Sequence, residues 1–405
     1  MINKKKTRIN KKIFFDFIFN LIAFVSYIFF SQIILMPFLN KTLSEAEFAN
    51  YVIYVSIFSI MTNTFGNELG IARQVDNRSN IEEKYNNILI KMMILVFIAS
   101  IILLSFFKYS VLTVIMFSLT IILGNIRLYT ASYFRINKKF KEILFQNIIY
   151  ILGAIVGLII YINCKIIWIP TLIGEICSFI YNIKKSDLTR VSKSNQKMDK
   201  KALKTFKDYS LISFFLNTMT YFDKILIYPI LGQNSVNIYY TTTTMSKVTA
   251  LLINPMQGVI LSWIDGENED KKNELIKNIF KYAFLLIFIF TIISIPLTYI
   301  AIKILYNKYL AESLEIIVIV CMSLSISMVT TTIKSIILKF TDSKKLLNIY
   351  IINICSFITL SIILSKLYKL KGFAIANLLS KIILLILYIL LLNKIKNGKV
   401  INEKK

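Results

Sequence analysis

Apolar runs of about 20 residues recur along the whole chain, and a helix needs about 20 residues to cross the hydrocarbon core of a bilayer. Hydrophobic residues make up 56% of the 405 positions, which leaves too little polar surface for a soluble protein of this length. The pattern predicts an all-α polytopic membrane protein. About twelve candidate transmembrane helices fall near 13–36, 46–65, 88–107, 110–133, 143–162, 165–183, 209–231, 236–263, 279–302, 313–338, 346–365 and 371–392.

The distribution of basic residues predicts the orientation. The net charge is +26, which in a soluble protein would suggest a nucleic-acid partner. Here most Lys and Arg lie in the tails and in every second loop, and such loops stay on the cytoplasmic side of a membrane. We therefore expect both termini in the cytoplasm and no nucleic-acid partner. The basic segments are the N-terminal tail, 66–87, 135–142, 184–208, 265–281, 339–345 and the C-terminal tail.

The longest polar segment, 184–208, divides the predicted spans into six and six. The start of each half carries a related sequence, in the same direction, which indicates a parallel internal repeat. We expect an N-terminal six-helix lobe (1–183), a basic cytoplasmic linker (184–208) and a C-terminal six-helix lobe (209–405). The matched residues are Asp16, Phe30, Ile33, Pro37 and Leu39 with Asp208, Phe222, Ile225, Pro229 and Leu231.

Charged residues inside the predicted spans are functional candidates, because a charge in hydrocarbon costs at least a few kcal/mol. At about 1.5 Å of rise per residue, Lys224 and Lys247 lie deep within consecutive spans, and Lys381 lies at mid depth. Arg127 falls nearer the cytoplasmic end, where it can reach the interface or pair with a carboxylate on a neighbouring helix. The candidates for a cationic binding cavity are Lys224, Lys247, Lys381 and Arg127.

Polar residues cluster beside these charges. The segment "YYTTTTMSK" (239–247) places hydroxyl groups on several faces of one predicted helix. Some can donate to carbonyls of their own helix, but a wet cavity accounts for the whole cluster. Prolines 37 and 229 predict either a bend or an early end of the helix, and Pro255 predicts a kink. The expected cavity lining is Gln32, Tyr239, Tyr240, Thr241, Thr242, Thr243 and Thr244.

Several enzyme classes lack the residues they need. The chain has no histidine, and its four cysteines are scattered without metal-binding spacing, so we expect no metal site and a packing role for the cysteines. It has no GxxxxGK[ST] phosphate loop and hence no ATP hydrolysis by that route. The predicted outer loops are too short for the carboxylates or arginines of a membrane glycosyltransferase. We expect a protein that is not an enzyme and holds no cofactor.

Three segments resemble a known family. They are "YFDKILIYPILGQNSVNIYYTTTTMSK" at the start of the second half, "LMPFLNKTLSEAEFANYVI" in the first, and "YFRINKKFKEILFQNII". Together with the two-lobe plan, they resemble the polysaccharide exporters and O-antigen flippases of the multidrug/oligosaccharidyl-lipid/polysaccharide (MOP) superfamily. One departure is Ala49, where the family usually has glycine, and it leaves the related drug and metabolite exporters open.

The resemblance implies a central cavity lined by spans 1, 2, 7 and 8. It implies a polyprenyl-diphosphate-linked oligosaccharide as cargo, membrane lipids and a glycan polymerase or other polysaccharide-assembly proteins as partners, and the bacterial cytoplasmic membrane as location. The cationic residues would bind the diphosphate, and the Thr and Tyr hydroxyls the sugar. Coupling to an ion gradient would need a carboxylate, for which Asp223, Asp16 and Glu175 are candidates.

The leading hypothesis is therefore a flippase that moves a lipid-linked glycan by alternating access. One alternative is an ion-coupled exporter of drugs or small metabolites. Another is a membrane-embedded glycan polymerase, for which no outward-facing catalytic residues are found. A major-facilitator transporter would also have six plus six spans, but "GNELGIARQVDNR" (66–78) lacks the full signature of that group.

Overall fold

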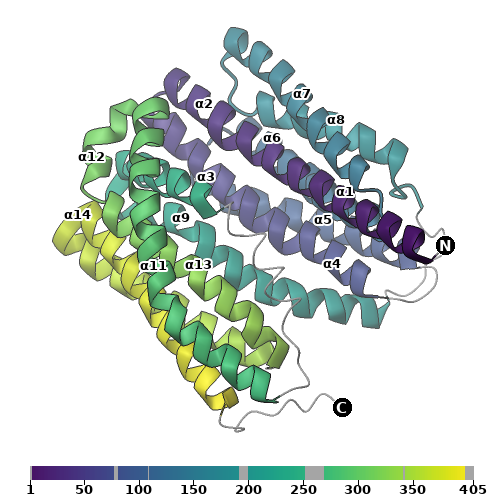
Figure 1. The fold of residues 1–405 in the computed structure, drawn as a ribbon. Helices are drawn as coiled ribbons and strands as arrows, with labels where there is room; N and C mark the ends of the chain where they lie inside the picture. The colour runs from purple at the N-terminus through teal and green to yellow at the C-terminus, as the bar shows by residue number, and fades with distance from the viewer. Residues whose placement is uncertain are drawn as a thin grey trace. The chain divides into compact units, whose positions relative to one another are not determined.

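The computed structural model describes residues 2–76, 81–107, 109–190, 199–250, 269–340 and 343–396. Helices are the only regular secondary structure in these ranges (Figure 1), which confirms the all-α fold class. Six helices of the described residues are long and apolar enough to cross a membrane, or seven if the bent pair Asn307–Leu314 and Ile317–Thr331 is one span. The protein is thus a multi-pass membrane protein. The count of twelve spans and the side of the termini stay predictions, and Pro255 lies outside the described residues.

The first predicted span is one continuous helix that contains a π-helical turn. It consists of α1 (Ile2–Phe29), a π-helical turn (Phe30–Leu35) and α2 (Met36–Thr42). A proline ring collides with the carbonyl four residues before it, and the wider π turn directly before Pro37 gives that ring room. The backbone N–H of Met36 donates to Ser31 O, five residues back. Pro37 therefore marks a local change of helix type and does not end the helix.

The second span begins with a capping box and extends further than expected. Ser44 and Glu47 bond reciprocally: Ser44 N–H donates to Glu47 Oε2 over 3.0 Å, and Glu47 N–H donates to Ser44 Oγ over 3.3 Å. This pairing satisfies the first turn of α3 (Glu45–Met61). A second π-helical turn (Thr62–Asn67) and α4 (Glu68–Val75) follow, so much of the predicted loop 66–87 is helical.

Four helices follow before the polar linker. They are α5 (Ile81–Ser105), α6 (Val111–Ile136), α7 (Phe140–Cys164) and α8 (Ile169–Lys185). Helix α7 packs along α8 and also against α1. Glycine allows the α7–α8 approach, because a Cβ on Gly157 would lie 2.6 Å from Pro170 Cα.

The second half contains two long helices that are each broken once. Helix α9 (Lys200–Ala250) breaks at Gly232, whose φ of 79° is in the region that favours glycine. Helix α14 (Ser343–Lys396) breaks at Tyr368 and Lys369. Between them lie α11 (Glu269–Leu305), a 3₁₀ turn (Asn307–Tyr309), α12 (Leu310–Leu314) and α13 (Ile317–Phe340). Both breaks fall where the sequence predicts one span to end and the next to begin.

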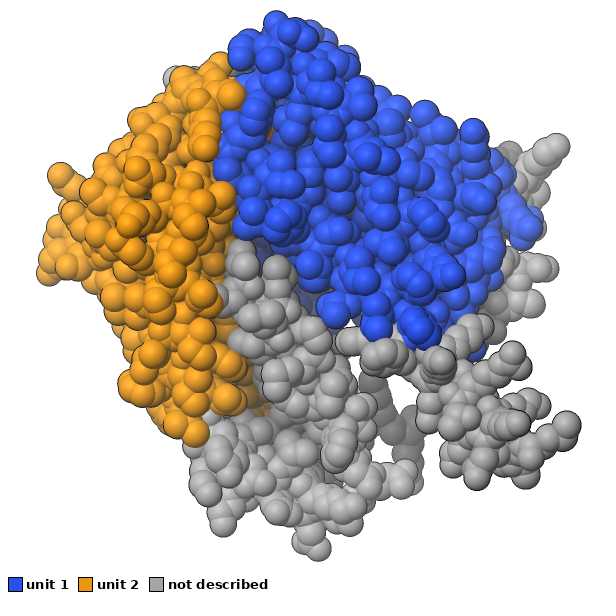
Figure 2. All heavy atoms as spheres, turned by 45° about the horizontal axis from the view of Figure 1, so that its top comes forward, with its two compact units in different colours: residues 1–38, 53–222 blue, residues 39–52, 223–405 orange. Residues whose placement is uncertain are grey.

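The chain divides into two compact units (Figure 2). Unit 1 comprises residues 1–38 and 53–222, and unit 2 comprises 39–52 and 223–405. The turn between the first two spans therefore belongs to unit 2. There, Asn237 Nδ2 donates to Glu45 O over 2.9 Å, and the rings of Phe48 and Tyr240 meet edge to face. The lobes divided at 184–208 stay a prediction.

Candidate functional site

Asp223 and Lys224 form a buried ion pair in unit 2. Lys224 Nζ lies 2.6 Å from Asp223 Oδ1 and 2.7 Å from Oδ2, and the backbone N–H of Lys224 also donates to Oδ1. Asp223 is 5% exposed and Lys224 is 3% exposed, so the pair is shielded from bulk water. Consecutive side chains on a helix do not face each other, so the long lysine side chain must fold back to reach its neighbour. The Asp223 carboxylate is thus held by the side chain of the next residue on its own helix.

Two further lysines join this pair. Lys247, on the second half of α9, interacts electrostatically with Lys224, Asp223 and Lys381. Lys381, on the second half of α14, interacts with Asp223 and Lys224. The structure therefore brings together three of the four predicted cationic residues and one predicted carboxylate. We call these four residues the lysine cluster.

Polar and aromatic side chains surround the lysine cluster. Lys224 Nζ lies 5.9 Å from the centre of the Tyr239 ring, within the range of a cation–π interaction. Asn377 Nδ2 donates to the Tyr239 hydroxyl, and Ser323 Oγ donates to Asn377 Oδ1 over 3.2 Å. Residues from α9, α13 and α14 thus fix the tyrosine beside the cations.

The four threonines are buried, and their hydroxyls are largely used within the protein. Thr241 and Thr242 donate to Ile238 O, and Thr243 donates to Tyr239 O. Thr242 Oγ1 also bonds Ser313 Oγ at 3.0 Å. Thr242 thereby links α9 to α12, and the bonds to Ile238 and Tyr239 lie within α9. Their role as a cavity lining stays a prediction.

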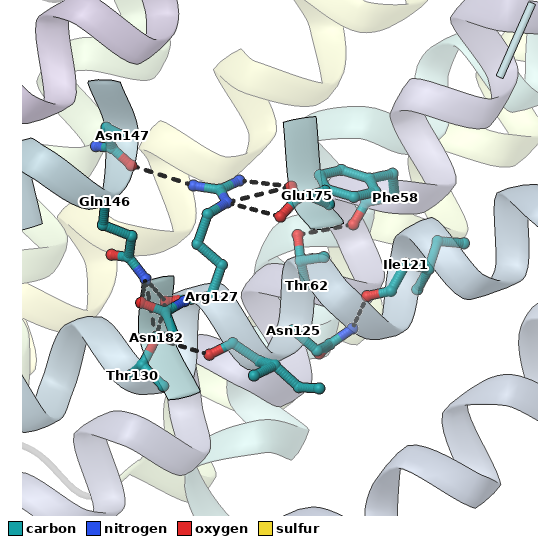
Figure 3. A network of polar contacts seen from close by, with 11 residues as sticks. Phe58, Thr62, Ile121, Asn125, Arg127, Thr130, Gln146, Asn147, Glu175 and Asn182 are labelled. Carbon is teal, nitrogen blue, oxygen red and sulfur yellow. Dashed lines mark hydrogen bonds and ion pairs between the residues drawn. The ribbon is translucent and has the colours of Figure 1, made fainter. Parts of the chain in front are cut away.

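Arg127 and Glu175 lie together in unit 1, whereas the lysine cluster belongs to unit 2. Arg127 Nε lies 3.1 and 3.0 Å from the two carboxylate oxygens of Glu175, and a terminal nitrogen lies 3.1 Å from Oε1 (Figure 3). The residues are 4% and 1% exposed. The predicted cationic residue and the predicted coupling carboxylate therefore bind each other.

Two further predicted residues lie in the first helical segment. Asp16 is half-buried on α1, and Gln32 is half-buried in the π-helical turn Phe30–Leu35. Gln32 has a polar contact of its own. Asp16 forms no ion pair within the described residues.

Sequence reasoning missed a second buried ion pair of unit 1. Arg73 on α4 pairs with Asp187, which follows α8, and its guanidinium also donates to the Tyr129 hydroxyl over 3.1 Å. Asn86 Nδ2 donates to the carbonyls of Asp187 and Arg190. The sequence analysis placed these residues in two solvated loops, and nothing in the basic linker distinguishes Asp187 from the other acidic residues there, Asp199 and Asp208.

No protein-family model matches the chain, and no curated protein matches it. Solved structures do match it over nearly its whole length. One is the lipid II flippase MurJ in an inward closed conformation, at 17% identity and a TM-score of 0.65, covering 96% of this chain and 90% of that one. The fold is therefore that of MurJ.

MATE structures share this fold. A MATE in the bent conformation matches at 12% identity with a TM-score of 0.62, covering 96% of both chains. An outward-facing multidrug resistance MATE family transporter of the MOP superfamily matches at 10% identity with a TM-score of 0.63, covering 94% of both. At these identities the similarity establishes the fold alone. What the protein carries must be argued from its own residues.

Proposed function

We propose that this protein is a flippase that moves a polyprenyl-diphosphate-linked oligosaccharide across the bacterial cytoplasmic membrane by alternating access. The lysine cluster is the observation that supports this most. It sets three lysines against one carboxylate inside apolar helices of unit 2. Cations in hydrocarbon are costly unless they are neutralised, so an excess of them suits an anionic cargo.

The charge of the cluster fits a diphosphate diester. The cluster contains three lysines and one carboxylate, and each phosphate of such a diester carries one negative charge. Lysine serves as a compact point charge for phosphate. The polyprenyl tail can stay in the bilayer while the diphosphate crosses at the cluster.

The sugar would be bound by hydroxyl and amide groups beside the cations. Tyr239 and Asn377 lie next to Lys224 and already bond each other. A tyrosine offers both an apolar face and a hydroxyl to a sugar ring. Arg127 is not part of this binding set, because Glu175 already takes up its guanidinium. A glycan polymerase and other polysaccharide-assembly proteins would act on the cargo after it has crossed.

The fold supports the same proposal. MurJ, to which this chain is similar, is described as a lipid II flippase, and a lipid-linked cargo agrees with the charge of the cluster. An enzymatic function has no support from the fold, since the matched structures are a flippase and transporters.

The test is the pool of lipid-linked glycan in a deletion strain, measured together with surface polysaccharide. Loss of surface glycan with full-length lipid-linked units accumulating at the inner leaflet is expected. Lys247→Gln and Lys381→Gln should reproduce the defect when the variant proteins are present in the membrane at normal levels. Lys366→Gln is the matched control, because Lys366 is exposed.

Two other outcomes would reject the proposal. Single units exposed at the outer leaflet would indicate a polymerase. An unchanged glycan pool with altered sensitivity to drugs or metabolites would indicate an ion-coupled exporter. The exporter is the second candidate, since multidrug resistance MATE transporters share the fold at TM-scores of 0.61 and 0.63, against 0.65 for MurJ.

A further inference from the structure

The buried charges of unit 1 form a closed polar core. Arg127 comes from α6 and Glu175 from α8, and three N–H···O contacts of 3.0–3.1 Å join them. A guanidinium meeting both oxygens of a carboxylate is among the stronger hydrogen-bonded pairs in proteins. Both side chains are almost fully buried, so water does not compete for either partner.

The remaining faces of the guanidinium are also occupied. Its carbon lies 4.4 Å from the centre of the Tyr27 ring and 5.0 Å from that of Tyr150. Its other terminal nitrogen lies 3.5 Å from Asn147 Oδ1 (Figure 3). Asn147 Nδ2 donates to Ala23 O over 2.8 Å. Helices α1, α6, α7 and α8 therefore all contribute to one site around a single cation.

A second layer fixes the backbone that carries Arg127. Gln146 Nε2 donates to Arg127 O over 2.9 Å, to Thr130 Oγ1 over 2.9 Å and to Asn182 Oδ1 over 3.0 Å (Figure 3). Hydrogen bonds with neighbouring amides therefore fix the position of Arg127 and restrict the movement of its side chain.

We propose that Arg127 is a built-in counter-cation for Glu175, so that this carboxylate binds no proton or metal ion during the transport cycle. The guanidinium of Arg127 contacts three oxygens, two from Glu175 and one from Asn147, and these oxygens would suit a monovalent cation. In this structure the guanidinium occupies that place. An ion-coupled step, if the protein has one, then belongs to one of the other two candidate carboxylates, Asp16 or Asp223. This inference concerns the polar core of unit 1 and does not depend on the nature of the cargo.

The proposal predicts a latent cation site. A buried carboxylate that loses its partner must be neutralised in another way. In Arg127→Met the Glu175 carboxylate would take up a sodium ion or a proton. The double variant Arg127→Met/Glu175→Gln has no charge to neutralise and would take up neither. Arg127→Lys restores a cation and should behave like the wild type.

Thermal unfolding of the purified protein in detergent tests this directly. Sodium chloride and lithium chloride are compared with choline chloride at equal ionic strength, at pH 6 and pH 8. The Arg127→Met midpoint should rise by roughly 5 °C or more once sodium exceeds its dissociation constant about a hundredfold, or on moving to pH 6. The double variant, Arg127→Lys and the wild type should show no such rise.

Two results would overturn the inference. One is an Arg127→Met protein whose midpoint responds to sodium and to acid no more than the double variant does. The other needs no Arg127 variant: a sodium-dependent midpoint in the wild type that disappears in Glu175→Gln would show that Glu175 binds an ion despite Arg127. Because the assay measures unfolding, its outcome is separate from any result on glycan export.

Discussion

Removing either partner of the Asp223–Lys224 pair should have unequal effects. Asp223→Asn leaves three lysines in the cluster with no carboxylate. Lys224→Gln leaves Asp223 within electrostatic range of Lys247 and Lys381. The remaining lysines can therefore compensate for the loss of Lys224, whereas nothing in the cluster compensates for the loss of Asp223.

The magnitude follows from burial. Breaking a buried ion pair by removing one partner costs about 3–5 kcal/mol of folding stability, because the other charge stays buried and unpaired. Asp223→Asn should show that full cost, since its side chain and that of Lys224 are only 7% and 4% exposed. Lys224→Gln should cost about 1–3 kcal/mol, closer to the loss of a buried hydrogen-bond partner. The double variant Asp223→Asn/Lys224→Gln should lie above Asp223→Asn in stability, because it removes one of the uncompensated cations.

Thermal unfolding of the four proteins in detergent gives the ranking. The expected order of midpoints is wild type, Lys224→Gln, the double variant and Asp223→Asn, with the two middle proteins close together. Asparagine is the right replacement at 223, since its side-chain oxygen can still accept the Lys224 backbone N–H. A Lys224→Gln protein that is as unstable as Asp223→Asn would refute the view that Lys247 and Lys381 share the carboxylate.

Two further predictions concern unit 1. Gly66→Ala should destabilise the protein by about 2–4 kcal/mol, because the added Cβ would lie 2.4 Å from Asn125 O and would disturb the 2.7 Å bond from Gly66 N–H to Asn125 Oδ1; an unfolding midpoint equal to that of an exposed control such as Ser105→Ala would contradict it. Asp187→Asn should cost about 3–5 kcal/mol by leaving Arg73 buried without its carboxylate. Asp187→Asn should also speed proteolysis in the adjoining linker, and unchanged cleavage would argue against anchoring by this pair.

The sequence was sufficient for the helical architecture because hydrophobic length is a local property. Each stretch of about 20 apolar residues must bury its backbone polar groups in a helix when it lies in a bilayer. The described residues of the predicted segments accordingly lie largely in helices, although the second helical segment extends beyond its predicted end. The breaks at Gly232 and Tyr368–Lys369 could also be predicted from the sequence, since each follows an apolar run long enough to span a membrane. The two π-helical turns were not, because they depend on how Pro37 and Gly66 meet their neighbours.

The candidate site could be predicted from the sequence only in part. Burial depth singled out Lys224, Lys247 and Lys381, and these three do meet in unit 2. The partners of each charge could not be derived, since pairing depends on side-chain direction and on helix packing. Lys224 binds the residue beside it, which spacing rules on a helix disfavour. Arg127 binds a residue 48 positions away.

The buried arginines of unit 1 form structural ion pairs, whereas the buried lysines of unit 2 form the proposed binding site. The different chemistry of the two side chains explains this division. In unit 1, Arg73 and Arg127 each hold a buried carboxylate with a planar fork of N–H groups and stack on tyrosine rings. Such pairs are rigid and specific. The lysine cluster of unit 2 instead uses point charges on flexible side chains, which can exchange one oxygen partner for another at little geometric cost. A cargo phosphate could therefore replace Asp223 as the partner of Lys224, whereas the arginine pairs would have to lose two aligned bonds at once. The excess of cations in unit 2 and the exact neutralisation of these arginines in unit 1 are consistent with one unit that binds an anion and one whose polar core stays fixed.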